Sequence, residues 1–321
     1  MTIYILRRLL QAIPLLVGII LINFTLVNLA PGDPILIIAG DQVLSPQYEA
    51  ELRARFNLDR PPLERFLIYA GEVVQGNLGY SIYFKRPVTE LFLSRLGPTL
   101  LLFVPQFILS ALLGVLLGVI SATRRGSWQD TAATIIALMA YSLPLFWLGQ
   151  LCVGFFAVKL QWLPAGGLYS LQEDLQGIER VADAGRHLIL PTFVLALSHL
   201  ALVTRITRAS LLDVLALDYV RTARSKGLPE RTVTYRHALK NAIIPVVTTL
   251  GLSIGFMLSG SVLAETVFSW PGVGRLTYQA ILQRDYPLML GVLLITSITV
   301  IVANLITDLV YAALDPRIRN T

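Results

Sequence analysis

Few residues in this 321-residue chain have the type and spacing needed for covalent, metal or acid–base chemistry. The single cysteine, Cys152, lies in an apolar stretch, and one cysteine can form neither a disulfide framework nor a cysteine metal cluster. The three histidines, His187, His199 and His237, are not part of an H-E-x-x-H pair. The sequence contains no G-x-x-x-x-G-K-S/T phosphate-binding loop, which argues against an ATPase in this chain. We therefore expect no catalytic residue, no metal site and no cofactor within the chain.

A different kind of chemistry, the passage of a solute through a membrane, places polar residues inside apolar segments. Asp308 follows Asn304 by one helical turn, so the two residues face one way. Ser198 and His199 lie in another apolar segment, and Glu265 follows a third. All five are candidates for the passage or its gate. The alternative is that each is satisfied by helix packing, or that Glu265 caps an outer interface.

The composition indicates which elements must position these residues. The chain is 55% hydrophobic and 14% charged, with a mean hydropathy of +0.67. Soluble domains have roughly 25% charged residues and roughly 45–50% apolar residues. These values exclude a disordered chain and argue strongly against a soluble enzyme. We therefore predict a membrane protein.

Windows without Asp, Glu, Lys or Arg that reach about 20 residues predict membrane-spanning helices. The six windows are 9–32, 96–123, 131–158, 187–204, 241–264 and 286–307. The predicted fold is therefore all-α, with six transmembrane helices. Four prolines within apolar runs predict kinks: Pro14, Pro105, Pro144 and Pro245. Two pairs of glycines four residues apart predict close helix packing: Gly114 with Gly118, and Gly251 with Gly255.

Lys and Arg are concentrated in the segments that share a side with both termini, above all in 205–240. The positive-inside rule then places both the N-terminus and the C-terminus in the cytoplasm. The segment after the first span also carries basic residues, but long loops have little weight in this rule. The basic balance therefore reflects membrane topology, and we expect no nucleic-acid partner.

This topology divides the chain into three parts. Residues 1–32 form an N-terminal helix with the first span, 33–95 an extracytoplasmic cap, and 96–321 a core domain with five spans. Helical patches at 47–56 and 63–74 are separated by turn signals in the cap. The cap either docks a partner on the outer face or only packs on the helices.

The cytoplasmic segment 205–240 has the pattern of a helix, a glycine turn and a second helix. Apolar residues recur at helical spacing over 210–226, and Gly227 follows, as expected of a glycine that closes a helix in the left-handed conformation. Pro229 and Glu230 suit the first turn of a second helix. A short helix held at the membrane surface can dock into a groove of a partner. The alternative is a solvated basic loop.

This segment resembles the EAA loop of permease subunits in ATP-binding-cassette (ABC) importers. Ala223, Gly227 and Leu239 match the general pattern. The runs 219–228 and 237–245 match the Y-V-R-T-A-R-x-K-G-L and H-A-L-x-N-A-x-x-P forms of its dipeptide/oligopeptide/nickel branch. Further motifs of that branch follow in order along the whole chain: 4–9, 31–34, 76–81, 268–274, 284–287 and 314–317. The long segment after the first span looks like that of the B-type subunit.

The resemblance implies a type I ABC importer transmembrane domain in the inner membrane of a bacterium or archaeon. It implies a second, C-type permease subunit, two ABC ATPase subunits that bind ATP and Mg, and an extracytoplasmic substrate-binding protein. It also implies that the EAA-like segment couples to the ATPases. The residues expected to do so are Asp218, Tyr219, Val220, Arg221, Thr222, Ala223, Arg224, Ser225, Lys226, Gly227 and Leu228.

The cargo implied by the resemblance is a di- or oligopeptide, with nickel, a nickel chelate, glutathione or an oligosaccharide as alternatives within the branch. Two other classes stay open from the residues alone. A self-sufficient secondary transporter would more often show inverted repeats and ionisable residues at the midplane. An intramembrane enzyme would need a catalytic pair of aspartates in neighbouring spans, and only Asp308 is available.

Overall fold

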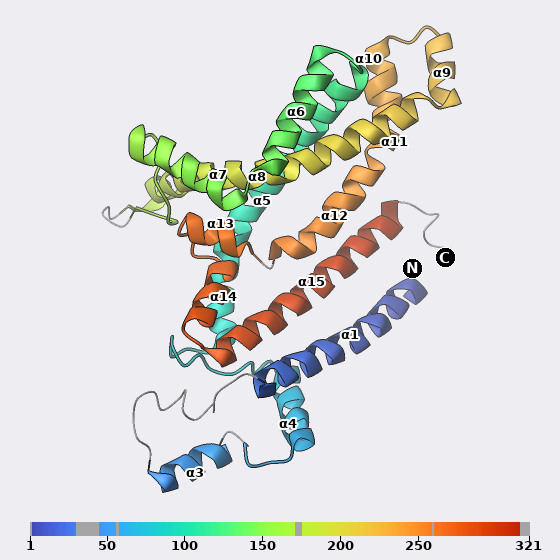
Figure 1. The fold of residues 1–321 in the computed structure, drawn as a ribbon. Helices are drawn as coiled ribbons and strands as arrows, with labels where there is room; N and C mark the ends of the chain where they lie inside the picture. The colour runs from blue at the N-terminus through green and yellow to red at the C-terminus, as the bar shows by residue number, and fades with distance from the viewer. Residues whose placement is uncertain (1, 30–44, 56–57, 171–174, 259, 315–321) are drawn as a thin grey trace.

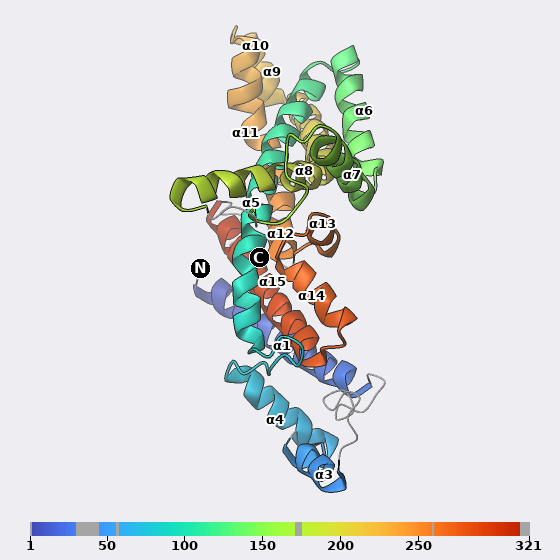
Figure 2. The same ribbon diagram turned by 90° about the vertical axis from the view of Figure 1, so that its left-hand side faces the viewer.

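The computed structural model describes residues 2–29, 45–55, 58–170, 175–258 and 260–314. Within these residues all regular structure is helical, apart from one isolated bridge between Tyr80 and Pro87. This confirms the predicted all-α class. Figures 1 and 2 show an elongated molecule in which α5 (Val88–Thr123) runs through much of its length.

Within the described residues, three helices are long and apolar enough to cross a membrane: α5, most of α8 (Gly177–Leu215), and α15 (Tyr286–Leu314) over Tyr286–Thr307. A fourth crossing is formed if α6 (Trp128–Ser142) and α7 (Leu145–Cys152), which continues into the π-helix η1 (Val153–Lys159), count as one span. In addition, α1 (Thr2–Leu29) has a shorter apolar section, Leu10–Leu26. These apolar helices identify a multi-pass membrane protein.

Two predicted spans are interrupted. The window 131–158 bends by 99° between α6 and α7. Leu143 adopts an extended conformation before Pro144, which has no N–H to continue the helix, so the kink predicted there is confirmed. The window 241–264 was expected to be one helix, and this was wrong. It is divided into α12 (Ile244–Leu258) and α13 (Val262–Val267) because Gly260 has a φ of +75° and Ser261 caps α13.

The central contact of the fold is the packing of α5 on α8. A Cβ atom on Gly114 would lie 2.6 Å from Cβ of Val203, and one on Gly118 would lie 2.5 Å from Cβ of Thr207. Only glycine permits this approach of the two helices, so the packing role predicted for this pair is confirmed. On the other side of the molecule, α12 and α1 both pack against α15.

The two helical patches predicted after the first span are present as α3 (Pro46–Arg55) and α4 (Pro62–Val74). The ring of Phe66 on α4 contacts Phe24 on α1 edge-to-face, with centroids 5.5 Å apart. The helix α5 begins at Val88, eight residues before the apolar window 96–123, because Val88, Leu91 and Phe92 in its first turns pack in one core with residues of α15. Residues 33–44 of the predicted cap lie outside the described part of the chain.

The molecule has two distinct ends. The helices α3 and α4 lie at one end, and α9 (Asp218–Ser225), α10 (Glu230–Thr232) and α11 (Leu239–Ala242) lie at the other (Figures 1 and 2). The N-terminal end of α1 and the C-terminal end of α15 both point away from α3 and α4 (Figure 1). We call these two ends of the molecule the α4 end and the α9 end.

Candidate functional site

The α9 end begins where α8 stops at Leu215. Tight turns carry the chain into α9, with the N–H groups of Ala216 and Leu217 donating to the carbonyls of Asp213 and Val214. A continuous helix over 210–226 was predicted, and this was wrong. The chain turns because apolar residues on both sides of the break, Leu211 and Val220 among them, pack in one core.

One face of α9 is buried in that core. Val220 is fully buried and Ala223 nearly so. They pack against the ends of α5 and α8 and against η2 (Val233–Ala238) and α11, through Val119, Ala122, Leu211, Val233, Ala238 and Ala242. The spacing of three residues between Val220 and Ala223 gives α9 one apolar stripe, and this fixes which of its faces points outward.

The outward face of α9 and the turn after it are exposed and mostly polar. The exposed residues are Asp218, Tyr219, Arg221, Thr222, Arg224, Ser225, Lys226, Gly227 and Leu228. Three of them are basic and one is acidic. All eleven residues predicted for ATPase coupling thus form one short element, two anchoring it and nine presented outward. Among the described residues, only Tyr219 and Arg224 of these nine form side-chain bonds to later parts of the segment.

Gly227 closes α9 with a φ of +75°, as its position in the sequence predicted. Its N–H donates to the carbonyl of Arg224 at 2.9 Å. A Cβ atom added to Gly227 would meet nothing within 4 Å. The requirement for glycine here is therefore one of backbone conformation and not of space.

Tyr219 joins α9 to the later part of the segment, η2 and α11. Its hydroxyl donates to the carbonyl of His237 at 3.3 Å and accepts from Nδ2 of Asn241 at 2.9 Å. The two sequence runs 219–228 and 237–245 are thus held together by the first residue of one and by His237 and Asn241 of the other. Residues of both motifs therefore hold α9 in place against η2 and α11.

An ion pair between Arg224 and Glu230 spans the turn between α9 and α10. Both Nε and Nη2 of Arg224 donate to Glu230, with the shortest distance 2.7 Å. The hydrogen bond from Arg224 lowers the pKa of the Glu230 carboxyl from its ordinary value. The same bond raises the pKa of the Arg224 guanidinium.

We expect the variant Glu230→Gln to loosen α9 slightly, by less than about 1 kcal/mol, because both partners are largely exposed to solvent. The folded-state pKa of Glu230 is lowered, so this stabilisation is present above the ordinary carboxyl pKa and is lost as pH falls through the lowered value. Amide hydrogen exchange over 218–230 measures both effects. The variant Glu51→Gln on α3 serves as the control, and equal exchange in Glu230→Gln and the parent would contradict the prediction.

A charged cluster next to this site was not predicted as functional. Arg208 on α8 donates from Nε and Nη2 to the two carboxylate oxygens of Asp130, at 2.8 and 2.9 Å. Asp130 also accepts from the Ser121 hydroxyl on α5 and from the N–H of Gly126 at 3.0 Å. One carboxylate thus joins α5, α6 and α8 one turn before the core under α9. In the sequence, Asp130 and Arg208 stand out only as charged residues near the edges of two predicted spans.

The candidate passage residues lie on different elements. Ser198 and His199 are half-buried on α8 and face the carbonyls of Val194 and Leu195 in their own helix, at 3.5 Å each. Asn304 is half-buried on α15. Asp308 lies on the same helix, but its side chain is outside what the structure describes. Among the described residues no hydrogen bond or ion pair joins the α8 pair to Asn304.

Glu265 lies on α13 and is fully buried beneath the loop that leads to α14 (Val273–Leu282). Its carboxylate accepts from the Thr99 hydroxyl at 3.2 Å and from the N–H of Arg275 at 2.8 Å. A Cβ atom on Gly272 would lie 2.4 Å from this carboxylate. The run 268–274 therefore winds around Glu265, which leaves this side chain no surface for a solute in the conformation described.

Two further motifs meet at the α4 end. The Asp285 carboxylate accepts from the Ser81 hydroxyl at 2.5 Å and from the N–H of Tyr83 at 3.0 Å. Its other oxygen accepts from the N–H of Leu288 at 3.2 Å and so caps α15. Residues 76–81 and 284–287, far apart in sequence, are thus hydrogen-bonded to each other at the α4 end.

The fold and the α9 end together define a class, a helical multi-pass membrane protein that presents a short anchored helix beyond its spans. The family model of the binding-protein-dependent transport system inner membrane component matches residues 114–320. The chain belongs to this family, the membrane component of ABC importers. Such components are typically non-catalytic.

Full-length relatives have the same class of name. The chain is 40% identical to the dipeptide transport system permease protein DppB of Escherichia coli, over 99% of this chain and 98% of the relative. It is likewise 40% identical to the di/tripeptide transport system permease protein DppB of Pseudomonas aeruginosa, with the same coverage. The oligopeptide transport system permease protein AppB of Bacillus subtilis is 40% identical over 99% of both chains.

A solved structure shares the fold. A chain of the MetNI methionine ABC transporter, in an inward facing conformation, superposes with a TM-score of 0.55 at 18% identity. The match covers 71% of this chain and 97% of that one. The core of the present fold is therefore that of an ABC transporter membrane domain.

Proposed function

We propose that this chain is the B-type permease subunit of an ATP-driven importer of di- and oligopeptides. The peptide cargo is supported by the names of relatives that are 40% identical over nearly the whole chain. The single observation that carries the mechanism is α9, a short helix anchored by Val220 and Ala223 with its polar face outward.

In this proposal the α9 end lies in the cytoplasm, and six spans place both termini on that side. The concentration of Lys and Arg in 205–240 supports this orientation. The outward face of α9 docks on an ABC ATPase, which binds ATP and Mg. When the ATPases close, α9 moves with them and carries α8 and the core under α9. The ion pair between Asp130 and Arg208 passes that movement on to α6.

The remaining partners follow from the same architecture. A second, C-type permease completes the passage, a second ATPase docks on it, and an extracytoplasmic binding protein delivers the peptide at the α4 end. Ser198, His199, Asn304 and Asp308 are proposed to line the passage or its gate, because polar side chains within spans are costly unless they serve water, solute or each other. Glu265 is proposed to act there only if the loop around it opens.

The cargo is tested with the complete complex in proteoliposomes. We expect ATP-dependent uptake of a labelled dipeptide that requires the binding protein and is competed by other short peptides. A nickel chelate or an oligosaccharide should not compete. Uptake of Ni²⁺ or of a sugar with no uptake of peptide would overturn the assignment of the cargo. Peptide uptake by this chain alone would overturn the assignment of the machinery.

A further inference from the structure

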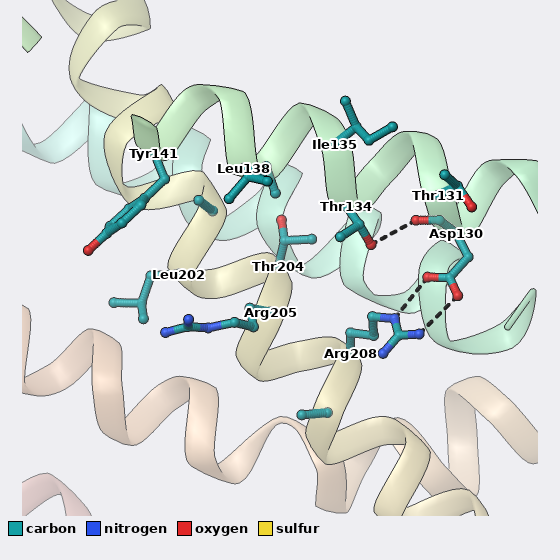
Figure 3. Close-up of a pocket in the computed structure, with 13 residues that line it drawn as sticks. Asp130, Thr131, Thr134, Ile135, Leu138, Tyr141, Leu202, Thr204, Arg205 and Arg208 are labelled. Atoms are coloured by element: carbon teal, nitrogen blue, oxygen red, sulfur yellow. Dashed lines mark hydrogen bonds and ion pairs between the residues drawn. The ribbon is translucent and has the colours of Figure 1, made fainter. Parts of the chain in front are cut away.

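A groove of about 500 Å³ runs between α6 and α8 (Figure 3). Along its α6 wall the side chains of Ile135, Leu138 and Tyr141 follow at intervals of three residues. These side chains are 50%, 62% and 73% exposed. Such a row of apolar groups is costly in water and favourable against hydrocarbon.

The α8 wall adds a positive charge. Arg205 is exposed and extends along the groove toward Leu202 (Figure 3). Among the described residues no acidic side chain forms an ion pair with it. The nearest carboxylate lining the groove, Asp130, is already occupied by both donors of Arg208. Within the described residues, Arg205 therefore places on the α8 wall a positive charge that no carboxylate neutralises.

A buried hydroxyl also faces the groove without a partner. Thr204 is 3% exposed and lines the groove, and its Oγ1 makes no hydrogen bond in the described structure. By contrast, the hydroxyl of Thr134 across the groove donates to the carbonyl of Asp130 at 2.8 Å. A buried polar atom without a partner costs free energy, but this oxygen is enclosed and does not reach a ligand in the groove as described.

The groove lies at the level where lipid headgroups are expected. The predicted spans begin at 131 and end at 204, which places Asp130 and Arg205 at the membrane boundary. Trp128, at the start of α6, is 75% exposed, as is typical of an aromatic residue in the interfacial belt. The apolar row runs deeper from Ile135 to Tyr141, and the Arg205 side chain extends beside it (Figure 3).

We propose that this groove binds one anionic phospholipid of the cytoplasmic leaflet. Arg205 pairs with the phosphate, and one acyl chain lies along Ile135, Leu138 and Tyr141. The assignment to the cytoplasmic leaflet rests on the orientation given in the proposed function.

Lipid retention by the purified complex tests whether lipid binding depends on the charge of Arg205. The complex is exchanged into vesicles of phosphatidylglycerol and phosphatidylethanolamine, re-extracted and analysed by native mass spectrometry. We expect phosphatidylglycerol to be enriched, and Arg205→Gln to reduce its retention about fivefold, the effect of one basic residue at an anionic surface. Arg205→Lys should restore retention, and Arg236→Gln, an exposed arginine on η2, should leave it unchanged. Equal retention in the parent and all three variants would overturn the proposal.

A photo-crosslinking amino acid at Leu138 tests the occupant without disturbing Arg205. We expect an adduct with the mass of a phospholipid. An adduct with the second permease subunit would show that a protein helix fills the groove and would overturn the proposal. Neither readout depends on transport. A phospholipid adduct in a complex that takes up no peptide would therefore contradict the proposed function alone.

Discussion

Replacing Gly227 with valine is expected to reduce peptide uptake by at least about tenfold while the subunit still inserts and assembles its spans. The φ of +75° at Gly227 costs a β-branched residue about 1–3 kcal/mol. An added Cβ atom would meet nothing within 4 Å, so the penalty is released by rotating the turn, which moves α9 away from its docking position. Uptake and ATPase activity in proteoliposomes measure the effect, and we expect ATP hydrolysis to become independent of the binding protein.

Two variants control for a general loss of stability. Gly76 at the α4 end has a φ of +80° and open space around it, so Gly76→Val applies the same backbone penalty far from α9. Gly227→Asn keeps a residue that tolerates the left-handed conformation. We expect both to retain most of the ATPase coupling. Normal uptake by Gly227→Val would show that the turn geometry does not matter for transport.

Replacing Asp130 with alanine is expected to lower the stability of the complex in detergent by about 1–3 kcal/mol, since it leaves the half-buried Arg208 without its counter-charge. The change also removes the acceptor of the Ser121 hydroxyl and of the Gly126 N–H. The midpoint of thermal unfolding, followed by loss of the intact complex, measures the effect. Uptake should fall as well, because α6 is no longer tied to α8.

The double variant Asp130→Ala/Arg208→Ala isolates the pair. We expect it to be more stable than Asp130→Ala alone, because the unpaired charge is gone. The exposed pair of Arg86 and Glu90 is the matched control, and Glu90→Ala should cost less than about 1 kcal/mol. A cost for Asp130→Ala no larger than that of the control would mean that this cluster does not hold the three helices together.

The sequence predicted those parts of the fold that depend on local rules. Apolar length predicted α5, α8 and α15, the two helices of the cap followed from their polar and apolar spacing, and Pro144 predicted the bend between α6 and α7. Gly114 and Gly118 predicted a close helix contact, because small residues four apart leave room for a neighbouring helix, but that this helix is α8 was not predicted.

The parts that were wrong or missed depend on contacts between distant residues. The break at Ala216 and Leu217 has no proline or glycine, and it exists because Leu211 and Val220 share one core. The enclosure of Glu265 depends on Thr99, which lies in another helix, and on the wrapping of 268–274. No spacing rule links Asp130 to Arg208, so their ion pair could only be found in three dimensions.

The central claim is that the outward face of α9 is the docking surface for an ATPase, and site-specific photo-crosslinking in native membranes tests it most directly. A crosslinker at Thr222 sits on the exposed face of α9, and one at Leu63, which is 71% exposed on α4, serves as the control. The account predicts an adduct between position 222 and an ABC ATPase, sensitive to ATP, and no ATPase adduct from position 63. The absence of any ATPase adduct from position 222, in membranes that take up peptide normally, would contradict it.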